Sequence, residues 1–92
     1  MLDECFIDFT RGESMLPWLN DYPSLVLLRA FTKIYALAGL RLGYALCADE
    51  GFMERLRAFG QTWGVSGPAQ AAGLAALADA GFLARTRLLV EA

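Results

Sequence analysis

Histidine is absent from the 92 residues, and cysteine is scarce. Without histidine, a Ser-His or Cys-His catalytic pair is excluded within this chain, and so are zinc centres of the usual type. The two cysteines, Cys5 and Cys47, both lie in apolar runs that are typical of strands. We therefore expect them to be buried thiols of a cytoplasmic protein, and neither a disulfide nor a metal pair.

Positive charge is also scarce, since the formal net charge is −2 and no basic run occurs. The chain therefore lacks the electrostatic footprint of a nucleic-acid-binding surface. A long apolar run is missing as well, because the uncharged window of residues 60–78 is interrupted by Gly64, Gly67 and Pro68. This interruption argues against a membrane span, and no basic segment of a secretory signal opens the chain. We expect a cytoplasmic protein that binds neither nucleic acid nor a membrane.

Apolar residues, by contrast, are abundant and make up 57% of the chain. Average soluble domains are about 45–50% apolar even when glycine is counted. A chain of this length also buries only a modest fraction of its surface. We therefore interpret the sequence as a piece of a larger hydrophobic core.

Lysine occurs once, at Lys33, and every other cationic side chain is an arginine. The apolar residues 25–28 lead into it, and Arg41 follows eight positions later. Burial makes an amine easier to deprotonate, which it needs if it is to attack a carbonyl group. Arginine keeps its proton and can hold a phosphate through its planar fork. This pair of residues suggests that the chain binds a phosphorylated carbonyl compound. The alternative is that Lys33 has no such role and simply reaches water from the end of a strand.

The segment around this lysine resembles the lysine signature of fold-type I pyridoxal phosphate enzymes, the class I and II aminotransferases. In that signature a hydroxyl residue precedes the lysine, and an arginine follows eight residues later between two glycines. The matching positions are Thr32, Lys33, Gly39, Arg41 and Gly43. The family also has an aspartate at a strand end upstream of the lysine, and Asp3 fits that place. Two motifs in register argue against chance.

The resemblance implies that these residues hold pyridoxal 5'-phosphate. Lys33 would carry the cofactor through a Schiff base and then act as the base that moves the α-proton of the substrate. Thr32 and Arg41 would bind the phosphate, and Asp3 would keep the pyridine nitrogen protonated. Taken singly, Asp3 would more simply cap a turn or helix, and Arg41 would form a surface salt bridge. Their joint spacing with Lys33 favours the cofactor site.

The order of predicted strands and helices indicates an α/β fold. Strands are predicted at residues 4–9, 25–29 and 40–47, and helices at residues 15–19, 50–59, 68–78 and 82–91. The resemblance implies a three-layer fragment of the family's large domain, with a mixed, mostly parallel sheet and flanking helices. Residues 1–92 would then be a partial pyridoxal phosphate-binding domain, without its N-terminal part and without the C-terminal small domain.

Two departures from the broad family pattern narrow the prediction. Phe6 stands where many members have a tyrosine that bonds the phenolic oxygen of the cofactor, and Ala30 where many have a hydroxyl residue. With the segment around Trp63, these positions resemble the threonine-phosphate decarboxylases of cobalamin biosynthesis, which act on a phosphorylated amino acid. The histidinol-phosphate aminotransferases are the alternative within the family. Trp18 and Trp63 could equally be core residues.

The resemblance also implies a homodimeric enzyme whose site is completed by the partner chain. The 92 residues lack the other groups that bind cofactor and substrate in the family, so we expect this chain alone to be inactive. A second alternative comes from another class of protein. It is a small non-catalytic α/β module in which Lys33 and Arg41 bind a phosphate or lie on the surface.

Overall fold

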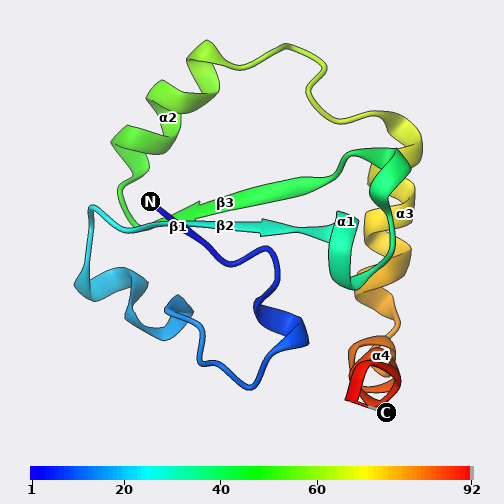
Figure 1. Ribbon diagram of the computed structural model, residues 1–92. Helices are drawn as coiled ribbons and strands as arrows, with labels where there is room; N and C mark the ends of the chain where they lie inside the picture. The colour runs from blue at the N-terminus through cyan, green and yellow to red at the C-terminus, as the bar shows by residue number, and fades with distance from the viewer. Residues whose placement is uncertain (92) are drawn as a thin grey trace.

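A three-stranded sheet forms the centre of the computed structural model, which describes residues 1–91 (Figure 1). The strands are β1 (Leu2–Asp3), β2 (Val26–Ala30) and β3 (Gly43–Cys47), in the order β1-β2-β3. β1 runs parallel to β2, with Leu2 opposite Leu27, whereas β3 runs antiparallel, with Gly43 opposite Ala30. The predicted mixed sheet is confirmed, and one of its two ladders in these residues is parallel.

Helices flank this sheet, as the α/β prediction requires. The α-helices are α1 (Phe31–Ile34), α2 (Glu50–Phe59), α3 (Gly67–Ala78) and α4 (Phe82–Glu91), and the 3₁₀ helices are η1 (Ile7–Phe9), η2 (Leu16–Asp21) and η3 (Ala38–Leu40). In Figure 1, α2 lies above the strands and η1 and η2 below them, whereas α3 and α4 stand beyond the end of β2. Among residues 1–91, no helix combines the length and the apolar character that a membrane span requires.

Two of the long helices begin at short-range capping signals. The Asp49 carboxylate accepts a hydrogen bond from the Phe52 amide (2.9 Å), and the Ser66 hydroxyl accepts one from the Ala69 amide (3.2 Å). Each bond satisfies an amide that the first turn of a helix leaves without a partner. The three helices predicted after residue 49 are confirmed to within one residue at each end.

The strand predicted at residues 4–9 is wrong, because β1 ends at Asp3 and the chain turns at once. The Asp3 carboxylate accepts a hydrogen bond from the Cys5 amide (2.9 Å). An aspartate that bonds the amide two residues later competes with extended backbone. The Phe9 amide then donates to the Phe6 carbonyl (3.0 Å) and closes η1. The apolar pattern in this segment therefore belongs to a tight turn.

Two other elements differ from their predictions. Strand β3 starts at Gly43 and not at residue 40, because Arg41 lies in the left-handed region, with φ 52° and ψ 58°, where a strand cannot continue. The short helix predicted at residues 15–19 forms as the 3₁₀ helix η2, which has Pro17 near its start and no side-chain cap. The predicted middle strand is confirmed as β2, displaced by one residue.

The core is small and centres on the middle strand. Leu27 on β2 and Ala69 on α3 are fully buried, and Phe31, the first residue of α1, is only 8% exposed. Gly73 lets α3 come close to the loop before β3, since an added Cβ would lie 2.6 Å from Leu42 Cδ2. These contacts hold α1 between the sheet and α3, and α1 carries the single lysine.

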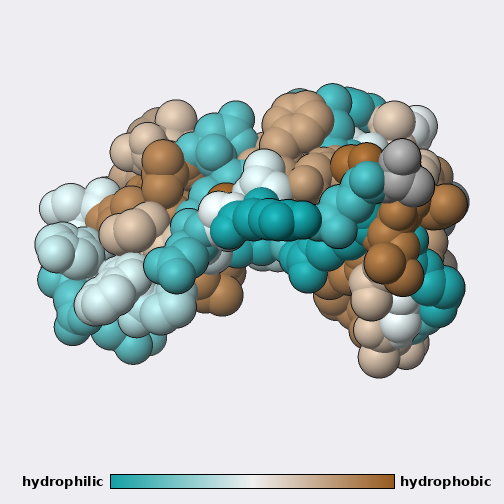
Figure 2. Space-filling model, turned by 60° about the horizontal axis from the view of Figure 1, so that its bottom comes forward, coloured by the Kyte–Doolittle hydropathy of each residue, from teal (hydrophilic) through white to brown (hydrophobic). Residues whose placement is uncertain are grey.

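Large apolar side chains remain exposed on α3 and α4. They are Leu74, Leu77, Leu88, Leu89 and Val90, which are between 54% and 78% exposed. Figure 2 shows hydrophobic residues gathered on the lobe that these two helices form. Trp18 and Trp63 are also exposed, at 52% and 88%, so neither is a core residue within residues 1–91. The sequence predicts more apolar surface than 92 residues can hide, and the described part of the chain shows it.

Candidate active site

The carboxyl ends of β1 and β2 lie at the same edge of the sheet because these two strands are parallel. Asp3 is the last residue of β1. Lys33 follows the end of β2, within the single turn of α1. Ligands of open α/β sheets bind in the crevice outside the carboxyl ends of the strands. The fold therefore brings Asp3 and Lys33 to one edge, although thirty residues separate them in the sequence.

Strand β3 begins at this same edge because it runs antiparallel to β2. The Phe31 amide at the start of α1 donates a hydrogen bond to the Leu42 carbonyl (3.0 Å). Arg41 thus precedes β3 next to the turn that carries Thr32 and Lys33. All four residues that the sequence predicts for cofactor binding map to one edge of the sheet.

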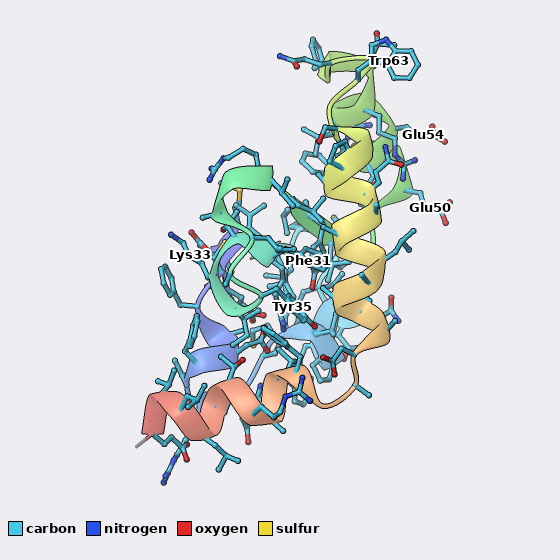
Figure 3. The ribbon with its side chains drawn as sticks, turned by 90° about the vertical axis from the view of Figure 1, so that its right-hand side faces the viewer. Phe31, Lys33, Tyr35, Glu50, Glu54 and Trp63 are labelled. Atoms are coloured by element: carbon cyan, nitrogen blue, oxygen red, sulfur yellow. The ribbon has the colours of Figure 1, made fainter. Side chains whose placement is uncertain are left out.

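The lysine side chain is exposed and points away from α3 (Figure 3). Its Nζ atom lies 5.2 Å from the centroid of the Phe6 ring. Within residues 1–91, no carboxylate forms an ion pair with it at 4.0 Å or less. In the described part of the chain the amine therefore lies at an open edge of the sheet and not in apolar surroundings. Thr32 is half-buried, and Arg41 is exposed.

Asp3 accepts hydrogen bonds from its neighbour Cys5, which lower the pKa of its carboxyl group. Hydrogen bonds from the Cys5 thiol and from the Cys5 amide hold the pKa of the Asp3 carboxyl below its ordinary value of 3.8. The same bond to Asp3, followed by burial, raises the pKa of the Cys5 thiol, and the nearby charge of Lys33 acts in the opposite direction. Near neutral pH, Asp3 is therefore an anion and Cys5 a neutral thiol. An anionic carboxylate at this edge can pair with a protonated nitrogen base.

Backbone strain occurs on both sides of η3, in the segment that joins Lys33 to Arg41. Ala36 and Arg41 both have left-handed backbone, with φ of 55° and 52°. This conformation costs an L-residue roughly 1–2 kcal/mol, and such strain clusters at functional sites. The Arg41 Nη1 atom donates to the Ala38 carbonyl (3.1 Å), which orients the guanidinium. The sequence gives no signal for this strain, because the glycine of the segment, Gly39, lies between the strained positions.

A buried ion pair that sequence reasoning missed fixes the turn after β1. Glu4 is 5% exposed, and its carboxylate accepts hydrogen bonds from the Ser14 hydroxyl (2.8 Å), the Met15 amide (2.8 Å) and Arg29 Nε (3.1 Å). Arg29 also donates to the Ser14 hydroxyl (2.8 Å) and lies 3.6 Å from Asp8. The available signal was an arginine directly after an apolar run, since a partly buried arginine needs an acidic partner.

A cavity of about 110 Å³ lies behind α1, on the side away from the lysine. Its lining includes Glu4, Asp8, Arg29, Tyr35 and Tyr44. Tyr35 stacks between Phe31 and Phe82, with ring centroids 5.1 and 5.4 Å away. Burial, and then the charge of Asp8, raise the pKa of Tyr35, so it remains a neutral phenol. The predicted cofactor residues do not line this cavity.

The chain matches the aminotransferase class I and II family over residues 1–90, and it belongs to that family. Members of the family depend on pyridoxal phosphate. The chain is 45% identical over 80 residues to threonine-phosphate decarboxylase from Salmonella typhimurium, covering 86% of this chain and 22% of that protein. It is 41% identical over 91 residues to histidinol-phosphate aminotransferase 1 from Psychrobacter arcticus, covering 97% and 23%.

The fold is similar to the crystal structure of the histidinol-phosphate aminotransferase from Clostridium acetobutylicum, with a TM-score of 0.86 and 27% identity. That match covers 94% of this chain and 26% of the solved chain. The predicted family and fold class are confirmed. The chain spans 22% and 23% of the lengths of the two relatives named above, so it corresponds to about a quarter of each.

The pKa of Glu4 leads to a testable pH dependence. Burial alone would raise it, but hydrogen bonds from Met15 and Ser14 and the charge of Arg29 outweigh burial and place the pKa below its ordinary value of 4.5. A carboxyl whose pKa is lower in the folded state stabilises the fold above the unfolded pKa, and this contribution is lost as the pH falls through the folded pKa. We therefore expect the free energy of unfolding to decrease as the pH falls below about 4.5.

Urea unfolding at about pH 7 and about pH 3.5 tests this expectation. Glu4→Gln should lower stability at the higher pH and flatten the dependence, while Asp3 and Asp79, whose pKa values are also lowered, leave a residual slope. Glu54→Gln on the exposed face of α2 is the matched control and should behave like the parent. If Glu4→Gln loses as much stability between the two pH values as the parent, the assignment of this pH dependence to Glu4 is wrong.

Proposed function

We propose that residues 1–92 form part of the large, cofactor-binding domain of a pyridoxal phosphate-dependent enzyme, and that the activity belongs to a longer protein. The observation that supports this proposal is that the topology carries Asp3, Thr32, Lys33 and Arg41 to one edge of the sheet. The span of about a quarter of each relative, given above as 22% and 23%, supports the partial domain.

The four side chains suit the chemical groups of the cofactor one by one. The amine of Lys33 suits its aldehyde, and the ionised Asp3 suits a protonated pyridine nitrogen. Arg41 and Thr32 offer a fork of charged donors and a hydroxyl donor, both of which suit the phosphate. When bound, pyridoxal phosphate supplies an electron sink for negative charge at the α-carbon of a substrate. The Lys33 Nζ atom would accept or return the proton at that carbon.

Within the family, we propose that the longer protein is a threonine-phosphate decarboxylase of cobalamin biosynthesis, which acts on a phosphorylated amino acid. The relative of that name is 45% identical to this chain. Phe6 also lacks the hydroxyl group of the tyrosine that many aminotransferases have at this position. A histidinol-phosphate aminotransferase is the alternative, supported by 41% identity and by the TM-score of 0.86. Membership of an enzyme family favours both over a non-catalytic phosphate-binding module.

We also propose that the longer protein is a cytoplasmic homodimer. The exposed apolar side chains of α3 and α4 support further packing on that lobe, because exposed apolar patches of this kind mark contacts with other protein surface. The rest of the large domain and the partner chain would share this packing.

Borohydride reduction in the presence of pyridoxal phosphate is expected to fix the cofactor mass at Lys33. Lys33 is the only lysine, so the N-terminal amine is the one competing group of its kind. Peptide mass mapping of the 92-residue chain locates the label, and Lys33→Ala and Lys33→Arg should keep only label at the N-terminus. Label confined to the N-terminus of the parent chain would contradict the role proposed for Lys33.

Arg41→Gln is expected to weaken labelling of Lys33 by pyridoxal phosphate but not by pyridoxal, which has no phosphate. A hydrogen bond to a charged group contributes about 1.5–3 kcal/mol, so the half-saturating concentration of the phosphorylated aldehyde should rise roughly tenfold or more. Arg57→Gln, at an exposed arginine of α2, is the matched control. Equal losses with both aldehydes would show that Arg41 supports the fold and does not bind the phosphate.

The longer protein should release carbon dioxide from carboxyl-labelled threonine phosphate without any added oxo acid. Decarboxylation needs no amino-group acceptor, whereas an aminotransferase requires an oxo acid and retains the carboxyl carbon. Trapped labelled carbon dioxide and oxo-acid consumption are measured side by side, with the 92-residue chain as the inactive control. Oxo-acid-dependent amino transfer with histidinol phosphate, and no carbon dioxide release, would favour the aminotransferase.

A further inference from the structure

The ammonium group of Lys33 forms a cation–π contact with the aromatic ring of Phe6. The Nζ atom lies 5.2 Å from the ring centroid, inside the roughly 6 Å range in which a cation is attracted to the face of an aromatic ring. Phe6 is 58% exposed, so its ring is available at the open edge of the sheet. Within residues 1–91 the ammonium has no ion pair that would compete with this contact.

The backbone holds Phe6 in this position from both sides. The Ile7 amide donates to the Glu4 carbonyl (3.1 Å), and the Phe9 amide donates to the Phe6 carbonyl (3.0 Å). The Glu4 carboxylate is itself fixed by the buried hydrogen bonds that tie it to Arg29. Phe6 therefore lies on an anchored turn, and its backbone is held near the end of β1.

We propose that Phe6 is a positioning residue that holds the free side chain of Lys33 as an ammonium at this edge of the sheet and releases it when a carbonyl compound enters the site. The inference rests on the role proposed above for Lys33. A phenylalanine ring offers no hydrogen-bond acceptor and no formal charge, so it holds a cation weakly and reversibly. An exposed cation–π contact of this kind is worth about two- to fivefold in an equilibrium. This is enough to select one position of a flexible side chain without blocking the reaction of its amine.

The reaction of the two amines of the 92-residue chain with trinitrobenzenesulfonate tests the proposal, since only a neutral, released amine reacts. Mass spectrometry gives the rate at Lys33 relative to the N-terminal amine of the same molecule. Phe6→Leu removes the ring and should raise this relative rate about two- to fivefold. Phe6→Tyr keeps the ring and should match the parent. Phe9→Leu, which removes a neighbouring ring 6.2 Å from that of Phe6, is the control for apolar packing and should also match it.

A spectroscopic signature of the contact provides the second measurement. Because the chain has one lysine, selective ¹³C-lysine labelling gives a single set of side-chain signals. The ε-methylene protons should be shifted upfield by the ring in the parent and in Phe6→Tyr, and should move to the position found in urea in Phe6→Leu. An unshifted parent signal, or equal trinitrophenylation rates in the parent, Phe6→Leu and Phe9→Leu, overturns the proposal. So does an equal acceleration in both leucine variants.

These measurements contain no pyridoxal phosphate, so they separate the two inferences. Loss of the Phe6 contact together with cofactor label at Lys33 would overturn the positioning role and leave the proposed function standing. An intact Phe6 contact without label at Lys33 would overturn the role proposed for Lys33, and would leave the cation–π contact but not its part in the reaction.

Discussion

The buried ion pair between Glu4 and Arg29 fixes the edge of the sheet on which the candidate site lies. A carboxylate taken out of water is costly unless it is paired and fully hydrogen-bonded. Glu4 obtains its donors from Ser14, Met15 and Arg29 only if the chain turns directly after β1 and returns beside β2. Asp3 lies directly before this turn, at the end of β1, and Phe6 lies within it. The residues proposed to act in chemistry thus flank one whose role is structural.

The same network ties the two ends of the described chain together. Arg29 contacts Asp8 (3.6 Å), and Asp8 in turn pairs with Arg87 on α4 (3.3 Å), 79 residues away in the sequence. The Arg87 Nε atom also donates to the Asp8 carbonyl (2.7 Å). Arg87 is about half exposed, and exposed pairs contribute little by themselves, so the inner pair of Glu4 and Arg29 is the dominant one. The outer pair sets where α4 lies against η1.

How much the sequence predicts depends on the range of the interactions involved. The helices that start at Asp49 and Ser66 are predictable because a cap and its amide lie within one turn. The segment at residues 4–9 is mispredicted because two features outweigh its apolar pattern: the local turn that Asp3 makes with the Cys5 amide, and the bonds of Glu4 to Ser14 and Arg29, 10 and 25 residues away. The four residues predicted to bind the cofactor come from the resemblance to the family's lysine signature. Their positions at one edge of the sheet follow from one parallel and one antiparallel ladder. The left-handed backbone conformation of Arg41 cannot be predicted from composition or periodicity.

The chain is similar to two relatives whose names state different activities, a decarboxylase and an aminotransferase, at 45% and 41% identity. Which bond at the α-carbon breaks depends on how the substrate is oriented. That orientation is set by groups that hold the carboxylate and phosphate of the substrate. Lys33, Asp3 and Arg41 are instead proposed to act on the cofactor, whose demands are common to both reactions. If the function proposed above holds, residues 1–92 carry the chemistry common to both reactions, and the choice between them is made mainly by the rest of the longer protein.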